Sequence, residues 1–441
     1  MVWLIPVLTL AILIVAWRNP RLFVPLLILT LPLELSRYWF PHIEALDRFG
    51  DFVGGLSLGR IFTFGLIGYF LFEQLRKRGR WFEVGDRSKF SWQSPLFLIL
   101  LAYILFGAIS IIWSVDIPKT IGGTVRLGVL WLLGMAVYYL LSKDRDFWLL
   151  PSSLSIVSII LALAGLFEIA TGNYFFMGDV YEPIGRINAS FIDSNIYARF
   201  LILGIIATLV WMVISRDRLS TALGLGVFFV QTAALVFTGS RAGWFTFAFV
   251  LLLFVILIPR KSIVFALLGG LVLAGIGIAF NPEQLTRLKE VTEGLRYLSG
   301  QRQFLVSAGW DMFLNNPILG VGLGGFQKMM LTEYKDLVQY GVSLSHTSII
   351  TTASELGIIG LLILAAALVF ILAQIPQALQ LRRFSTEGSE LNNSYFLTIF
   401  AVLGILTIFI SAQGEGRFFE DPFLWILLGY LAYLRDLREV G

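Results

Sequence analysis

One histidine and two arginines are the side chains of this sequence best suited to chemistry, because they lie among very few titratable groups. His346 directly precedes a long apolar run, Arg302 opens a polar stretch upstream, and Arg241 separates two apolar runs. An imidazole has an ordinary pKa of about 6.5 and can accept a proton at neutral pH. A guanidinium presents a planar fork of donors that binds phosphate or carboxylate in bidentate fashion. These side chains could activate a hydroxyl and bind a phosphate-type anion, although a purely structural histidine is the alternative.

Arg241 lies in the sequence TGSRAGW (238–244), a break of small residues between two apolar runs. Glycines there let the backbone approach a ligand, and the Ser240 hydroxyl adds a hydrogen-bonding group. Because a charge deep in lipid costs about 2.5–3.5 kcal/mol, we expect Arg241 to line a polar cavity. Arg126 and Arg199 are further candidates for binding a phosphate. Snorkelling is the simpler explanation of Arg126, and pairing with lipid phosphates or nearby acids could explain any single arginine.

Two helix starts would position these groups. Asp193 and Asn195 precede an apolar run that carries Arg199 in its first turn. The side chain of Asp193 or Ser194 can cap that helix, and capping alone could explain the motif.

The helix expected after His346 carries a second pattern. On a continuous helix, Gly357 and Gly360 share the stripe of the imidazole, which permits a close helix neighbour or a slot for a lipid tail. Glu355 falls on the opposite face, where an unpaired carboxylate is costly. We therefore expect Glu355 to pair with a buried cation or to cap a loop.

The elements that hold these residues must lie in a membrane. Hydrophobic residues make up 57% of the chain and charged residues 14%, and the mean hydropathy is +0.82. Too few polar groups remain to cover a water-facing surface. The absence of cysteine and the presence of only two histidines exclude disulfides, thiolate metal sites and a histidine-rich metal site. The net charge of +4 fits basic inner loops and gives no reason to expect nucleic-acid binding.

The sequence predicts an all-α, polytopic membrane protein with about 12–13 transmembrane helices, since each crossing needs about 20 apolar residues. The apolar runs are 2–17, 21–35, 57–75, 95–113, 121–142, 150–171, 197–214, 219–238, 242–258, 262–280, 346–373, 394–412 and 421–434. The basic linker 76–89 predicts a cytoplasmic loop. By alternation, the long polar segment 281–345 is a periplasmic loop with helices near 285–298 and 303–314.

The order of these motifs resembles the O-antigen ligase and O-antigen polymerase superfamily of bacterial surface-polysaccharide assembly. The family signature near its last large periplasmic loop is His, then Asn, Ser or Gln, nine residues and G-x-x-G. This sequence reads His346, Thr347, nine residues and GIIG (357–360). Thr347 departs from the usual residue but keeps a small polar side chain.

Upstream motifs extend the resemblance to about residues 185–375. Arg302, Trp310 and the glycine-rich GVGLG (320–324) follow the family order, as do the SRAG break and the Asp193-x-Asn195 element. With the hydropathy pattern, this suggests N-terminal transmembrane helices over 1–180, a catalytic core over 181–375 and C-terminal transmembrane helices over 376–441.

The resemblance implies a glycosyltransferase that needs neither a metal nor another cofactor. It would move a glycan from undecaprenyl pyrophosphate to an acceptor glycan or lipid A-core, at the periplasmic face of the bacterial inner membrane. His346 would be the catalytic base. The implied pyrophosphate-binding residues are Arg241, Arg302, Arg199 and Arg126, and the supporting residues are Asp193, Asn195, Glu355, Gly357 and Gly360.

Three alternatives stay open from the sequence. An O-antigen or exopolysaccharide polymerase would use the same chemistry on a different acceptor. Outward arginines could instead serve a transporter for a small anion such as bicarbonate, and a flippase for the lipid-linked donor is a third reading. A transporter or flippase should show a polar path through the whole bilayer, whereas the buried polar residues expected in this chain, apart from Glu73 and Glu168, gather toward one face.

Overall fold

A computed structural model describes residues 4–40, 56–76, 94–144, 146–174, 186–215, 217–279, 300–334, 345, 347–382, 390–416 and 418–440. His346 and the helix expected near 285–298 lie outside these residues, and the side chain of Arg302 is not described. Throughout the described ranges the regular structure is helical, without a strand, so the predicted all-α fold is confirmed.

The helices follow the apolar runs of the sequence. In chain order they are α1 (Leu4–Arg18), η1 (Pro20–Leu22), α2 (Phe23–Thr30), η2 (Glu34–Trp39), α4 (Leu58–Arg76), α5 (Pro95–Ile109), η5 (Ser110–Ile112), α6 (Ile117–Asp144), α7 (Leu149–Thr171), α8 (Ser194–Ser215), α9 (Arg218–Phe237), α10 (Arg241–Leu257), α11 (Lys261–Ala279), α13 (Gly300–Asn315), α14 (Phe326–Thr332), α15 (Ser348–Leu372), α16 (Gln374–Arg382), α17 (Glu390–Glu415) and α18 (Pro422–Val440). The expected helix over 303–314 is therefore confirmed as α13.

Seven helical stretches in the described part of the chain are long and apolar enough to cross a membrane, and four further apolar helices are shorter. This is a multi-pass membrane protein, with fewer clear spans than the 12–13 expected. The apolar run 21–35, for example, is divided between η1 and the eight-residue α2. Helix α18 ends in the charged sequence RDLRE, which lowers its mean hydropathy.

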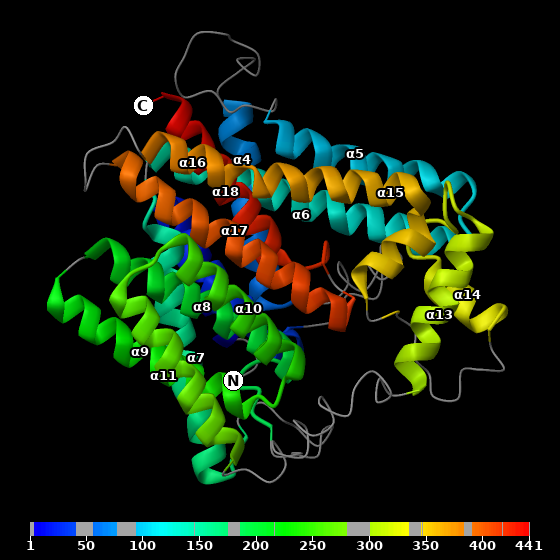
Figure 1. Cartoon of the computed structure of the whole chain (residues 1–441). Coiled ribbons are helices and arrows are strands. Elements are labelled where there is room, and N and C mark those ends of the chain that lie inside the picture. The colour runs from blue at the N-terminus through cyan, green and yellow to red at the C-terminus, as the bar shows by residue number, and fades with distance from the viewer. Residues whose placement is uncertain are drawn as a thin grey trace.

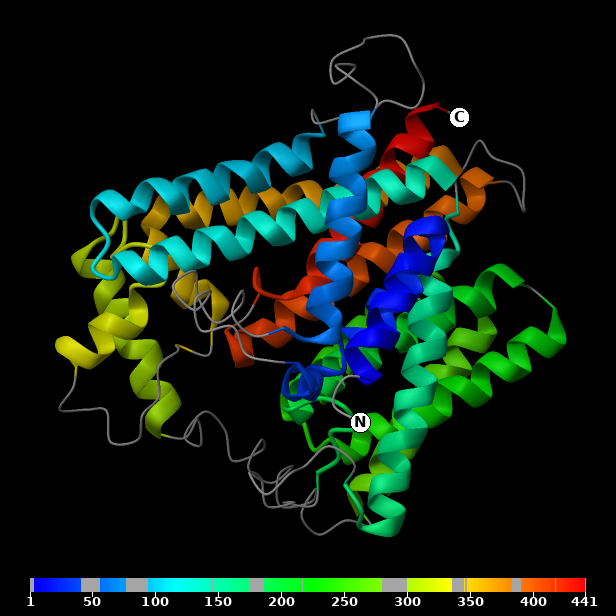
Figure 2. The same cartoon turned by 180° about the vertical axis from the view of Figure 1, so that it is seen from behind.

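Helices α8 and α17 lie inside the bundle. Both are buried over most of their length. Helix α8 is apolar on all sides, so neighbours can cover it on every face. Helix α8 packs against α7, α9 and α17, while α17 also packs against α18, and α18 against α6. Helices from the two ends of the sequence therefore share one core (Figures 1 and 2).

The two ends of the bundle differ. The C-terminus, α16 and the last turn of α4 lie at one end, and α13 and α14 lie at the other (Figures 1 and 2). Helix α5 runs from the first end to the second, so the α5–α6 turn and the start of α15 lie beside α13 and α14.

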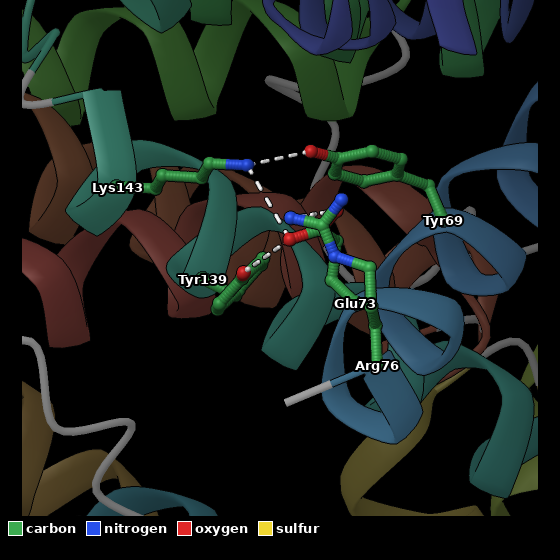
Figure 3. Close-up of polar contacts among 5 residues, drawn as sticks. All are labelled: Tyr69, Glu73, Arg76, Tyr139 and Lys143. Atoms are coloured by element: carbon green, nitrogen blue, oxygen red, sulfur yellow. Dashed lines mark hydrogen bonds and ion pairs between the residues drawn. The ribbon is translucent and has the colours of Figure 1, made fainter. Parts of the chain in front are cut away.

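A cluster of polar side chains joins α4 to α6 near the C-terminal ends of both helices (Figure 3). The Lys143 ammonium donates to the Tyr69 hydroxyl at 2.8 Å and lies 3.6 Å from the Glu73 carboxylate. The Tyr139 hydroxyl donates to the same carboxylate at 3.4 Å, and Arg76 approaches it at 3.8 Å. Glu73 is almost fully buried, so these partners offset the cost of removing its charge from water.

Candidate active site

The glycine-rich turn between α13 and α14 depends on residues without a side chain. Gly320, Gly322 and Gly324 have φ values of 67°, 94° and 76°, in the left-handed region that favours glycine. A Cβ on Gly320 would lie 2.5 Å from the backbone nitrogen of Leu356, and one on Gly322 would lie 2.5 Å from Ser114 Cβ. The sequence GVGLG thus lets the glycine-rich turn pack closely against α15 on one side and against the segment that joins α5 to α6 on the other.

Helix α15 is interrupted where it contacts the glycine-rich turn. Its backbone leaves helical geometry at Gly357, where φ is 62° and ψ is −158°. The carbonyls of Ser354 and Glu355 then accept from the N–H groups of Val321 and Gly322, each at 2.9 Å. In return, the N–H of Ile358 donates to the Pro317 carbonyl at 2.8 Å.

The expectation of one continuous helical stripe from position 346 to Gly360 is therefore wrong at Gly357. A Cβ at Gly360 would meet the Leu356 side chain of the same helix, so the contact predicted with a neighbouring helix is not what this glycine makes. The hydropathy pattern hides the break because Gly357 lies within an apolar run whose average does not change.

Glu355 caps the end of the glycine-rich turn, one of its two expected roles. Its Oε1 accepts from the N–H of Phe326, the first residue of α14, at 3.3 Å. The side chain is buried, and a helix N-terminus favours a carboxylate at that place.

The turn that joins α5 to α6 completes the support. The Ser110 hydroxyl accepts from the Leu323 N–H at 3.0 Å, and the Thr120 hydroxyl donates to the Leu323 carbonyl at 2.7 Å. The N–H of Val115 donates to the Val321 carbonyl at 3.1 Å. The glycine-rich turn is thus fixed by hydrogen bonds to η5, the segment between η5 and α6, α6 itself and α15.

Helices α13 and α14 pack on each other through Leu305, Ala308, Met312, Phe326 and Met330. The Tyr334 hydroxyl, after α14, donates to the Asp311 carboxylate on α13. Burial and this hydrogen bond raise the pKa of Tyr334 to about 12.

A cavity of about 270 Å³ lies where these elements meet. Helix α6 contributes Lys119, Gly122, Gly123 and Arg126, and the glycine-rich turn with α14 contributes Leu323, Gly324 and Gln327. The start of α15 contributes Ser348, Thr351, Thr352 and Glu355, and the segment before α18 contributes Gly416, Phe418, Phe419 and Glu420. Tyr103 of α5 completes the wall. The cavity draws residues from the first, middle and last parts of the sequence.

The segments next to position 346 are fixed at the rim of this cavity. The Gln413 side-chain amide, near the end of α17, donates to the Ser348 hydroxyl at 2.6 Å and accepts from the Ile349 N–H at 3.4 Å. The Thr347 hydroxyl donates to the Gln413 carbonyl at 3.4 Å. Gln413 therefore holds the residues that directly follow His346 in the sequence against α17.

Of the predicted arginines whose side chains are described, Arg126 lines the cavity, whereas Arg241, expected to line a polar cavity, is not among the residues of this one. Its guanidinium lies 3.0 Å from the Glu420 carboxylate, and the two side chains are 32% and 46% exposed. Arg126 also donates to the Glu420 carbonyl at 3.4 Å.

Arg199 occupies a different place. Its guanidinium forms an ion pair with Asp421 at 2.9 Å, and both side chains are almost completely buried. Asp421 also accepts from the Phe423 N–H at 2.8 Å, at the start of α18. Arg199 thus links α8 to α18 and is not among the cavity-lining residues.

Asp193 and Asn195 lie at the start of α8. The Asp193 carboxylate accepts from the Asn195 N–H at 2.7 Å, so the predicted capping role is confirmed. The Asn195 side-chain oxygen accepts from Arg186 at 3.1 Å, and Arg186 also donates to the Thr238 carbonyl at 2.7 Å. Arg186 thereby connects the start of α8 to the turn before α10.

Arg241 is the first residue of α10 and is exposed. Ser240 is the N-cap of this helix, because its hydroxyl accepts from the Gly243 N–H at 3.1 Å. The small residues around Arg241 therefore form a helix start, and Gly243 leaves room for the Ala198 side chain of α8. Arg302 lies in the first turn of α13.

These geometries can be compared with known proteins. Residues 226–365 match the model of the O-antigen ligase family. The resemblance is confirmed over that stretch, which holds Arg241, Arg302, the glycine-rich turn, His346 and the kink of α15. No curated protein matches the chain.

The stretch that matches the O-antigen ligase family thus supplies the turn and kink that shape one wall of the cavity. Arg126 and the other α6 residues of that cavity precede the matched stretch, as do Asp193, Asn195 and Arg199. In the described ranges, no three His, Cys, Asp or Glu side chains gather closely enough to hold a metal ion.

Sequence reasoning missed Lys119, Gln327, Glu420 and Tyr103 as cavity residues. A signal for Lys119 existed, since Lys119, Gly122, Gly123 and Arg126 have the i, i+3, i+4, i+7 spacing of one helix face. The apolar run predicted for this span begins at residue 121, so Lys119 lies outside it. Glu420 carries no local pattern, because its place follows from how α17 and α18 pack.

Proposed function

We propose that the protein is a membrane glycosyltransferase of the O-antigen ligase type. It transfers a glycan from undecaprenyl pyrophosphate to a hydroxyl of an acceptor glycan or lipid A-core. The observation that carries this proposal is the polar cavity, which joins cationic residues of α6 to the start of α15 in the matched domain. A base, an anion site and a lipid-accessible bundle are the parts that this reaction needs.

In the proposed reaction, His346 takes the proton of the acceptor hydroxyl, and that oxygen attacks the anomeric carbon of the donor. The bond from that carbon to the pyrophosphate oxygen breaks, and the electron pair leaves with undecaprenyl pyrophosphate. A positioned base accelerates such a step by about 10²–10⁴-fold. Pyrophosphate leaves readily as an anion, so its departure needs no general acid.

Cationic groups would stabilise the charge that grows on the leaving pyrophosphate. Each charge-assisted hydrogen bond contributes about 1.5–3 kcal/mol. Arg126 is the best-placed member of the predicted set, because it lines the cavity, and Arg241 and Arg302 are proposed to assist from the helix starts of α10 and α13.

We propose that the cavity faces the periplasm. The start of α6, which lines the cavity, lies at the end of the bundle occupied by α13 and α14. The helix ends that adjoin the basic linker 76–89 and the C-terminus lie at the opposite end, and the C-terminal sequence carries Arg435 and Arg438. Positive residues mark cytoplasmic loops, so this polarity supports a periplasmic site.

The test is transfer from a purified lipid-pyrophosphate-linked glycan by the protein in nanodiscs, in buffer containing EDTA. Product formed on lipid A-core indicates a ligase, and product formed on a second lipid-linked glycan indicates a polymerase. His346→Ala should remove transfer, and Glu333→Gln, an exposed change outside the cavity, should not. Uptake of bicarbonate or phosphate into proteoliposomes, with no transfer to any acceptor, would refute the proposal in favour of a transporter.

A further inference from the structure

One face of α6 forms a cationic stripe in the cavity. Lys119, Gly122, Gly123 and Arg126 all line the cavity and follow one another at the spacing of successive turns. Gly122 places no side chain between the two cations, while the Leu323 side chain lies 3.4 Å from the position of a Cβ on Gly123. The Lys119 backbone is itself fixed, because its N–H donates to the Asp116 carboxylate at 3.2 Å.

Glu420 faces this stripe and occupies one of its two cations. Its carboxylate lies 3.0 Å from the Arg126 guanidinium, while nearly half of its side chain remains exposed. An acidic side chain that lines a cavity with two cations must compete with any anion that binds there.

The backbone at position 420 is held firmly even though its side chain is exposed. On one side, Asp421 is buried in its ion pair with Arg199 and begins α18. On the other side, Phe418 and Phe419 are buried in the core. Glu420 can therefore change its side-chain rotamer without moving the chain, so the Arg126–Glu420 pair can open at small cost.

We propose that Glu420 is a built-in competitor for Arg126 that lowers the affinity of the cavity for every phosphate-type anion; this inference rests on the proposed function. Freeing Arg126 from Glu420 costs the same free energy whichever anion replaces it, so the competition weakens each anion by the same factor. A phosphodiester carries one negative charge and replaces one ion pair by another, whereas a diphosphate carries more charge and can also engage Lys119. The diphosphate of the donor therefore still binds, while the phosphodiester headgroups of the surrounding membrane, which bind more weakly, are kept from occupying the site.

The test is calorimetric titration of the full-length protein in a maltoside detergent, because phospholipid headgroups are themselves phosphodiesters. The probes are inorganic pyrophosphate and dimethyl phosphate, a soluble phosphodiester. Glu420→Gln should tighten pyrophosphate binding by about three- to tenfold, as expected for removal of one half-exposed charge. The same variant should tighten dimethyl phosphate binding by a similar factor, because both anions must displace Glu420 from Arg126.

Three controls make the result specific. Glu333→Gln removes the same charge outside the cavity and should leave both affinities unchanged. Arg126→Gln should weaken pyrophosphate binding, and adding Glu420→Gln to it should give no further gain, because the competition is for Arg126. Glu420→Asp keeps the charge with a shorter reach and should fall between the wild-type protein and Glu420→Gln.

Equal pyrophosphate affinity of the wild-type protein and Glu420→Gln would overturn the inference, as would tightening of only one of the two probes or no binding to either protein. Neither probe requires a glycan donor, so the result does not depend on transfer. If the affinities shift as expected while no glycan is transferred, the competitor role stands and the glycosyltransferase proposal fails.

Discussion

Substitution of Gly357 by alanine should be among the most damaging single-methyl changes in this protein. The backbone there has φ 62° and ψ −158°, a region that essentially only glycine occupies and that costs other residues about 1–3 kcal/mol. An added Cβ would lie 2.5 Å from the Ile318 carbonyl carbon and 2.8 Å from the Leu319 nitrogen. These are backbone atoms of the glycine-rich turn, so the turn itself must move.

Moving the turn puts three hydrogen bonds at risk, those from Val321 and Gly322 to α15 and that from Ile358 to Pro317. At about 1 kcal/mol each, their loss adds to the strain and gives a destabilisation of about 4–6 kcal/mol. Reversible unfolding in SDS, followed by tryptophan fluorescence, measures this directly, and glycan transfer should fall together with stability because the cavity wall is displaced.

Gly226→Ala provides the matched control. This glycine lies in α9, and nothing lies within 4 Å of the place where a Cβ would be added. Alanine favours a helix by up to about 1 kcal/mol over glycine, so this variant should be as stable as the wild-type protein or slightly more stable. If Gly357→Ala behaved like Gly226→Ala, the kink in α15 and its contact with the turn would be refuted, and a continuous helix would fit better.

Three further predictions concern single side chains. His346→Ala should lower transfer by at least about 100-fold while the SDS unfolding curve stays unchanged, since the proposed base acts in chemistry; a folded variant with normal transfer would contradict its role. Arg199→Met should lower the free energy of unfolding by about 3–5 kcal/mol, because it leaves Asp421 buried without this ion pair. Adding Asp421→Asn should recover part of the loss. A variant of normal stability that fails only in transfer would instead favour the predicted pyrophosphate role. Glu73→Gln should lower the free energy of unfolding by about 1 kcal/mol without altering transfer, and the value is small because Lys143 is exposed. Lost transfer at normal stability would give the polar cluster between α4 and α6 a direct part in the reaction.

The sequence predicted local features well where the cause is local. The capping role of Asp193 and the end of α13 follow from helix capping and termination, which depend on neighbouring residues. Glu355 was assigned to pairing or capping because burial in an apolar helix demands a partner, although its partner Phe326 could not be named in advance. The resemblance to O-antigen ligases rests on motif order, and the family match confirms it over residues 226–365.

Other features depended on contacts between distant segments. Arg126 and Arg199 look alike in sequence, as single arginines near the starts of apolar runs. Tertiary packing places Glu420 against Arg126 in a cavity and Asp421 against Arg199 in the core, although these acids are adjacent in the chain. No sequence periodicity could separate the two arginines, because the difference lies in which helix faces meet.

The sequence by itself determined an all-helical membrane protein, because apolar runs in lipid must satisfy their own backbone hydrogen bonds. It also determined where glycine was needed, since three of the glycines in the turn 320–324 have left-handed φ values. Only the tertiary structure decided that α15 breaks at Gly357 and that the released carbonyls bind this turn. The kink is stabilised by hydrogen bonds between two backbone segments that are distant in the sequence, so neither segment alone predicts it.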